Sequence, residues 1–165
     1  MPSLKGPAPG TKVAGGLTWG TIAAPNATGD EVAQDLMGIV AQIHAATKGL
    51  WSKFRIVLPI EQYNYAASKR LGSNSDITAL DFALKTSPFI QDIKAWYRCD
   101  GAGGGGTDRM MAFPLDSDVL GAVVPREYQT AAPQERNYAF VVNGRVSTAG
   151  FICRYPVAVA YGDGI

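Results

Sequence analysis

The chain has 165 residues, 47% of them hydrophobic, and a formal net charge of +1. A chain of this length buries roughly 70% of its unfolded surface, so it can build a core without disulfides or metals. The balanced charge argues against a basic nucleic-acid-binding protein. The lack of any apolar run of about 18 residues argues against a transmembrane helix.

Residues 1–26 are interrupted throughout by prolines and glycines and show little periodicity. This composition predicts an extended arm or linker, with a short strand near residues 17–22. The stretch lacks the apolar segment that signal peptides contain. We therefore place a boundary after residue 26 and assign residues 27–165 to one domain.

The first strong element begins after Thr28, which has the capping-box spacing to Glu31. Apolar residues then recur at helical spacing as far as Ile43, and Gly49 is a natural stop for the helix. His44 is the only histidine and falls on the flank of the apolar face. We interpret it as a half-exposed helix residue.

Two shorter helices are predicted after a strand at residues 50–58. Pro59 suits the first position of a helix that ends at Gly72. Asp76 is the expected N-cap of the next helix, which stops before Pro88. The expected buried positions are Ile60, Tyr63, Ala67 and Leu71 in the first of these helices and Ile77, Leu80, Ala83 and Leu84 in the second.

The rest of the chain is predicted to be β-structure. Residues 90–100 and 108–114 have the pattern of two strands, and the glycine-rich loop Gly101–Gly106 between them predicts a hairpin with a flexible tip. Further short strands are expected at residues 119–124 and 157–161.

A second hairpin is predicted at residues 138–142 and 146–154. The dipeptide Asn143-Gly144 between them is the one that best supports a type I′ turn. Helices thus come first and strands follow, without regular βαβ alternation. This order predicts an α+β fold with a largely antiparallel sheet.

The glycine-rich loop invites comparison with a phosphate-binding loop. Such a loop leads into a helix, whose amides and dipole converge on the phosphate. Here Gly106 is followed by Thr107-Asp108-Arg109 and then by a predicted strand. A hairpin tip is therefore the favoured interpretation.

No other pattern predicts a reaction centre. Asp116 and Asp118 lack the later oxygen ligands of a calcium loop, and Asp163 has no evident carboxylate partner. No serine lies in a Gly-x-Ser-x-Gly elbow. The single histidine removes most zinc sites. We therefore expect no enzymatic activity, no catalytic, cofactor-binding or metal-binding residues, and no cofactor.

The two cysteines, Cys99 and Cys153, lie in different predicted strands without CxxC spacing. Free, buried thiols are favoured over a disulfide in a chain without an export signal. The basic pair Lys69-Arg70 is interpreted as a solvated helix face rather than a phosphate-binding patch.

A series of short motifs, in a fixed order, resembles the end of a tailed-bacteriophage major capsid protein. Upstream the motifs are Leu58-Pro59-Ile60-Glu61-Gln62-Tyr63, Thr78-Ala79-Leu80-Asp81-Phe82 and Asp108-Arg109-Met110-Met111-Ala112-Phe113. Downstream they are residues 124–128 (VPREY), 133–138 (PQERNY), 150–158 (GFICRYPVA) and 161–165 (YGDGI). The resemblance covers residues 31–165, and its specificity rests on the order of the motifs and on the ending.

The resemblance implies the Hong Kong 97-type capsid fold, with an α+β axial domain and part of the peripheral domain. It implies a structural subunit of a phage or prophage capsid, which self-assembles into pentamers and hexamers around five- and six-fold axes and encloses double-stranded DNA. The implied location is the virion, and the bacterial cytoplasm before assembly, with no membrane partner. Family members are about twice as long, so the chain is expected to be a truncated domain or a short relative of the family. A monomer or a small ring is compatible with either.

Two other interpretations stay open. The first is the shell protein of a bacterial encapsulating nanocompartment, which shares the fold. The second belongs to another class of protein, a small ligand-binding α+β domain that uses the loop Gly101–Gly106.

Overall fold

The computed structural model describes residues 18–72 and 75–165. These residues form two compact units, and the second is inserted into the first. The first unit contains the described residues up to Asp116 together with Tyr155–Ile165, and the second unit is Ser117–Arg154. Residues 27–165, expected as one domain, therefore contain the second unit and most of the first, and residues 1–17 of the expected arm lie outside the described residues.

Helix α1 (Gly29–Thr47) begins at the predicted capping box. The Thr28 amide donates to Glu31 Oε2 at 2.7 Å, and the Glu31 amide donates to Thr28 Oγ1 at 3.4 Å. The hydrogen bonds from Thr28 lower the pKa of the Glu31 carboxyl below its usual value. At the other end Lys48 adopts a left-handed conformation, with φ 53°, and the chain turns through Gly49. The prediction of this helix is confirmed.

The predictions for the next two helices are correct in position but wrong in detail. Helix α2 (Ile60–Ser68) ends before Gly72, and Pro59 is its N-cap rather than its first residue. Helix α3 (Ala79–Thr86) is capped by Thr78, whose hydroxyl accepts from the Asp81 amide, and not by Asp76.

The buried face of α2 was predicted only in part: the expected Tyr63 and Leu71 are half-buried and pack against the core, and Ala67 is exposed. The buried face consists of Gln62, Tyr65 and Ala66, whereas Ile60 is 51% exposed. The buried face shifted because the Tyr65 hydroxyl donates to the Ala27 carbonyl at 2.6 Å inside the core. In α3 the predicted Leu80 and Ala83 are buried and Leu84 is half-buried; Ile77, before the helix, is exposed.

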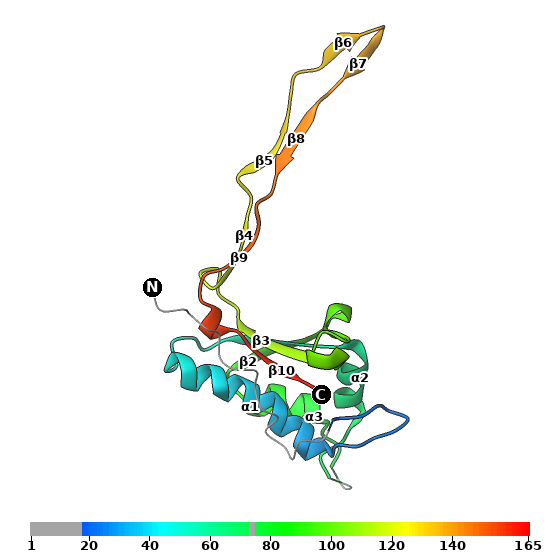
Figure 1. The fold of residues 1–165 in the computed structure, drawn as a ribbon, viewed down its shortest axis with the longest axis vertical. Helices are drawn as coiled ribbons and strands as arrows, with labels where there is room; N and C mark the ends of the chain where they lie inside the picture. Colours follow the sequence, from blue (N-terminus) through cyan, green and yellow to red (C-terminus); the bar gives the residue numbers. More distant parts are fainter. Residues whose placement is uncertain (1–17, 73–74) are drawn as a thin grey trace. The chain divides into compact units, whose positions relative to one another are not determined.

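The first unit is built on a four-stranded sheet with the order β10-β3-β1-β2 (Figure 1). Its strands are β1 (Phe54–Leu58), β2 (Ile90–Ala95), β3 (Arg109–Pro114) and β10 (Ala160–Asp163). Strand β1 pairs in parallel with β2 and antiparallel with β3, and β10 pairs antiparallel with β3. The predicted α+β class with a mostly antiparallel sheet is confirmed.

The predicted hairpin between residues 90–100 and 108–114 is wrong. Strand β1 lies between β2 and β3, and helices α2 and α3 form the connection from β1 to its parallel neighbour β2. Strand β1 takes the central place because four of its five residues are buried. The intervening chain forms a 3-10 turn, η1 (Tyr97–Cys99), followed by a second, η2 (Gly104–Gly106).

The core of the first unit includes a residue from the stretch expected to be an extended arm. Trp19 is fully buried, and its indole Nε1 donates to the buried Asp35 carboxylate at 2.9 Å. The short strand expected near residues 17–22 is represented by one isolated bridge between Gly20 and Pro25. Within the described part of the chain, residues 18–26 therefore belong to the first unit.

The second unit is a two-stranded ladder of antiparallel pairs, β4 with β9, β5 with β8, and β6 with β7. The rising strands are β4 (Leu120–Val123), β5 (Arg126–Thr130) and β6 (Gln134–Arg136). The returning strands are β7 (Ala139–Val141), β8 (Gly144–Ser147) and β9 (Gly150–Cys153). Together they form one long hairpin, drawn in yellow to orange-red in Figure 1.

The turn of this hairpin is not at Asn143-Gly144, as predicted, but at Asn137-Tyr138. These two residues have φ 51° and φ 63°, the positive values that a type I′ turn requires at both central positions. Gly144 lies instead in β8, opposite Thr130. A Cβ at Gly144 would lie 2.6 Å from the Tyr128 ring, so close packing explains this glycine. At the end of the chain a 3-10 turn, η3 (Pro156–Ala158), precedes β10.

Candidate functional site

The glycine-rich loop is fastened to the last strand of the first unit. Arg109 on β3 forms a bidentate ion pair with Asp163 on β10, with Nε–Oδ1 at 2.5 Å and Nη2–Oδ2 at 2.9 Å. The Gly104 amide donates to Asp163 Oδ2 at 3.2 Å. The Arg109 guanidinium also lies over the Tyr161 ring, 4.3 Å from its centroid. Asp163, for which the sequence offered no carboxylate partner, therefore pairs with a cation.

The ion pair favours the charged forms of both side chains and therefore shifts both pKa values. Hydrogen bonds from Arg109 lower the pKa of the Asp163 carboxyl, with a smaller contribution from the Gly104 amide. The same pair raises the pKa of Arg109 above its usual value. The side chains are only 28% and 25% exposed, so water screens the attraction incompletely.

Backbone groups of the loop already have partners within the protein. The Gly101 amide donates to Asp108 Oδ1 at 2.9 Å, and the Gly103 amide donates to the Thr107 carbonyl at 2.7 Å. Together with the bond from Gly104 to Asp163, these contacts use the donors that a phosphate would need. The loop is a hydrogen-bonded connection between η1 and β3.

The hairpin of the second unit has no core of its own. Residues 124–149 are all exposed, and they include large apolar side chains such as Phe140, 76% exposed, and Tyr128, 67% exposed. An isolated two-stranded hairpin is marginally stable in water, and both of its edges carry unpaired backbone groups. Exposed apolar area on this scale marks an interaction surface.

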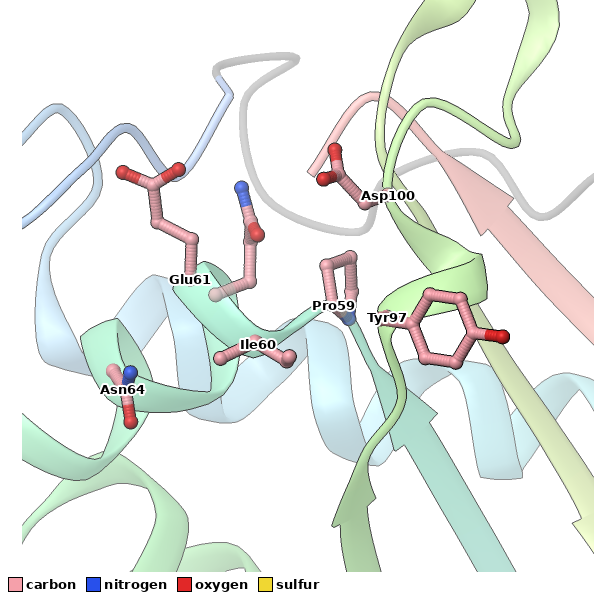
Figure 2. Close-up of a pocket in the computed structure, with 7 residues that line it drawn as sticks. Pro59, Ile60, Glu61, Asn64, Tyr97 and Asp100 are labelled. Carbon is pink, nitrogen blue, oxygen red and sulfur yellow. The ribbon is translucent and has the colours of Figure 1, made fainter.

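A pocket lies at the N-terminus of α2, where the chain leaves β1 (Figure 2). We call it the α2 pocket. It has a volume of about 300 Å³, and its polar lining comes from Glu61, Gln62 and Asn64 on α2 and from Tyr97 and Asp100 near η1. Among the described residues, the charged groups that line it are carboxylates, and none is a lysine or an arginine.

The residues considered for chemistry in the sequence are scattered. His44 packs edge-on against the rings of Phe54 and Phe89, at centroid distances of 5.1 and 4.3 Å. Asp118 pairs with Arg154 at 3.7 Å. Within residues 18–72 and 75–165 no group of three or more His, Cys, Asp or Glu side chains could hold a metal ion.

Neither cysteine forms a disulfide, but only one of them is buried. Cys99 is buried in η1, where burial raises the pKa of its thiol. Cys153 is exposed on β9, so the prediction of burial is wrong for it. The basic pair Lys69-Arg70 follows the end of α2. Lys69 lies 5.2 Å from the Tyr65 ring centroid, and Arg70, whose side chain is 64% exposed as predicted, lies 3.6 Å from Asp76.

Sequence reasoning predicted a hairpin in the second unit but missed its turn and its full extent, and it missed the α2 pocket altogether. A signal for the hairpin turn was available, because asparagine at position 137 tolerates the left-handed conformation. The stronger Asn143-Gly144 signal concealed it. The pocket had no local signal, since it joins α2 to a turn that follows β2. None of the helices in the described part of the chain combines the length and hydropathy that crossing a membrane requires.

Both the sequence and the fold of the chain match those of known proteins. The model of the major capsid protein family matches residues 7–165. The solved capsid of Myoviridae phage XM1 is similar, with a TM-score of 0.69 at 21% identity over 85% of this chain and 48% of that chain. A virus-like particle from Pyrococcus furiosus is similar with a TM-score of 0.52 at 17% identity, over 82% of this chain and 51% of that chain.

At these identities the two structures show a shared fold, and the chain spans about half the length of each. No curated protein sequence matches the chain significantly. The α+β capsid fold implied by the sequence motifs is confirmed by the match to the phage capsid. Because the family model covers nearly all of the sequence, the chain belongs to the major capsid protein family.

Proposed function

We propose that the chain is a structural, non-enzymatic subunit of a phage or prophage shell that encloses double-stranded DNA. The subunits associate around five- and six-fold axes, and the shell is located in the virion after assembly in the host cytoplasm. The first unit corresponds to the axial domain and the second to part of the peripheral domain.

The exposed hairpin of the second unit is the observation that carries this proposal. Residues 124–149 are exposed along their whole length and include apolar side chains. Soluble monomers rarely expose so large an apolar surface. Covering such a surface with neighbouring subunits would remove apolar area from water and pair the edges of the ladder. Family membership supports the choice of further capsid subunits as those neighbours.

Sedimentation and electron microscopy of the purified chain test the proposal. Across a range of protein and salt concentrations we expect five- or six-membered rings or closed particles. A chain that stays monomeric under every condition would contradict the proposal. Nucleic acid in particles isolated from cells would favour a virion over a nanocompartment that holds a cargo protein.

The nanocompartment remains the second candidate, because the Pyrococcus furiosus virus-like particle has a similar fold. It is the weaker candidate, since the TM-score is 0.52 compared with 0.69 for the phage capsid. The ligand-binding alternative is disfavoured by the engaged amides of Gly101, Gly103 and Gly104. A nucleotide that raises the melting temperature of the chain, but not that of Gly104→Pro, would restore it.

A further inference from the structure

The α2 pocket contains a buried polar atom without a partner. Gln62 is only 4% exposed, and its Oε1 accepts no hydrogen bond from the described residues. A buried carbonyl oxygen in this state is destabilising, and it is rare in native proteins. Because Gln62 lines the pocket, a donor that enters the pocket could satisfy this oxygen.

The charge of the pocket defines the kind of donor. Glu61 and Asp100 both line it, together with Tyr97, whose side chain is 62% exposed. In Figure 2 the Glu61 and Asp100 side chains both lie above Pro59 in the view, Glu61 to the left and Asp100 to the right. Two carboxylates, a free carbonyl oxygen and an aromatic ring together favour a cation that donates several hydrogen bonds. An anion would meet repulsion from both carboxylates.

The first unit offers such cations on its own surface. Its arginines are already engaged: Arg55, Arg70 and Arg109 in ion pairs, and Arg98 with Tyr97. By contrast, Lys48, Lys53 and Lys85 are exposed, and the described residues give them no ion pair. A lysine ammonium carries three donors on a flexible stem, which suits a pocket of about 300 Å³.

We propose that the α2 pocket receives a lysine side chain from the first unit of a second copy of this chain. The ammonium group donates to Gln62 Oε1 and pairs with Glu61 and Asp100. A contact between two different surfaces of identical subunits is heterologous, and such contacts close into rings. The inference rests on the proposed function, because it specifies one of the contacts by which the subunits associate.

Neutralising the pocket tests the inference. For the double variant Glu61→Gln, Asp100→Asn we expect at least a tenfold rise in the self-association Kd, and a weaker dependence of Kd on salt, because the variant lacks the charge attraction. Asp81→Asn is the matched control, since Asp81 is an exposed carboxylate in the first turn of α3. It should leave the Kd unchanged.

The variant Gln62→Met distinguishes an effect on the contact between subunits from an effect on the stability of the fold. Removal of the unpartnered oxygen at nearly constant volume should raise the Tm of the isolated chain by a few degrees. The same change should weaken self-association, because the lysine loses an acceptor. A variant whose Tm rises while its Kd is unchanged would contradict the role of Gln62.

Cross-linking identifies the occupant. A carbodiimide joins a carboxylate to an amine only when the two are in contact, and a mixture of ¹⁴N- and ¹⁵N-labelled chains distinguishes links between copies from links within one copy. We expect mixed-isotope links from Glu61 or Asp100 to a lysine. If the wild-type chain associates but gives no such link, and the double variant associates equally well, the inference is overturned and the proposed function stands. If the wild-type chain does not associate, both fail.

Discussion

The ion pair between Arg109 and Asp163 links the paired strands β3 and β10, and Asp163 also fastens the glycine-rich loop through the Gly104 amide. For Asp163→Asn we expect a loss of about 1–2 kcal/mol in the free energy of unfolding at pH 7, because a charge-assisted bidentate contact becomes a neutral one and partial exposure limits its strength. Chemical denaturation of the two proteins measures the difference.

The same contact predicts a pH dependence with a definite sign. The pKa of Asp163 is lowered in the folded state, so its contribution to stability is complete above the unfolded-state pKa of about 3.9. That contribution is lost as the pH falls through the lower, folded-state pKa. The stability difference between wild type and Asp163→Asn should therefore be constant from pH 7 to about pH 5 and shrink below pH 4. A difference that grows on acidification would contradict this assignment.

Neighbouring glycines in the loop should respond differently to substitution. A Cβ at Gly103 would lie 2.5 Å from Thr107 Oγ1 and 2.7 Å from the Thr107 carbonyl oxygen, whereas one at Gly104 would approach only Asp163 Oδ2, at 3.9 Å. We expect Gly103→Ala to lower the free energy of unfolding by about 1–3 kcal/mol. The matched Gly104→Ala should be neutral or slightly stabilising, since alanine restricts the unfolded chain. Thermal unfolding of both variants makes the comparison.

Some single residues could be assigned from sequence, and others could not. The capping box at Thr28 was predictable because both of its partners lie within one helical turn. The burial of Trp19 was not, because its partner Asp35 lies on the following helix and nothing near Trp19 indicates a core. The acceptor in the α2 pocket was likewise hidden, because glutamine is ordinarily an exposed residue.

At the scale of elements, the turn at Asn137-Tyr138 controls the hairpin. Tyrosine at φ 63° is strained, since side chains with a Cβ are disfavoured in the left-handed region. We expect Tyr138→Gly to stabilise the hairpin by about 1 kcal/mol. The nuclear Overhauser effects between the paired residues Glu135 and Phe140 should strengthen in NMR spectra.

Gly144→Ala is the contrasting change in the same hairpin. If Asn143-Gly144 were the turn, alanine would disrupt the reversal of the chain. In the observed register its Cβ would instead press on the Tyr128 ring, at 2.6 Å. We expect the contacts of the Tyr128 ring to change while those between Glu135 and Phe140 persist. Loss of the latter contacts would indicate that the reversal lies at residue 144.

The existence of elements was easier to predict than their pairing. Strands were expected at residues 50–58 and 108–114 from their composition, and β1 and β3 lie within these ranges. Their neighbours were not predictable, because strand order depends on which strand is buried on both faces. The nearness of residues 90–100 to 108–114 along the chain suggested a hairpin, but both strands gain more by pairing with β1.

At the scale of the whole molecule, the two units should be separable. The pair Val123 and Gly150 ends the ladder of β4 with β9, so an Asn-Gly turn could replace residues 124–149. We expect the excised chain to keep the Tm of the first unit within a few degrees, because those residues lie outside its core. Its self-assembly into rings or particles should be lost. Sedimentation and thermal unfolding measure the two effects, and an excised chain that still assembles would contradict the role of the hairpin.

The family was recognised from sequence although several pairings were not. The motifs that carried the resemblance lie in both units, from Leu58-Pro59 at the end of β1 to the closing residues of β10. Their order can be read from the sequence alone, so it does not depend on which strands are predicted to pair. The surfaces on which assembly depends are three-dimensional, and for that reason they required the structure.

The insertion of the second unit between β3 and β10 also bears on how the chain folds. Strand β10 must find β3 across the whole of that insertion, and closing a long loop is entropically unfavourable and slows folding. Hairpins form in about 1–10 μs. Once Leu120 has paired with Cys153, the loop that remains to be closed is short. A more stable turn at residues 137–138 should therefore accelerate the refolding of the first unit, to which those residues do not belong.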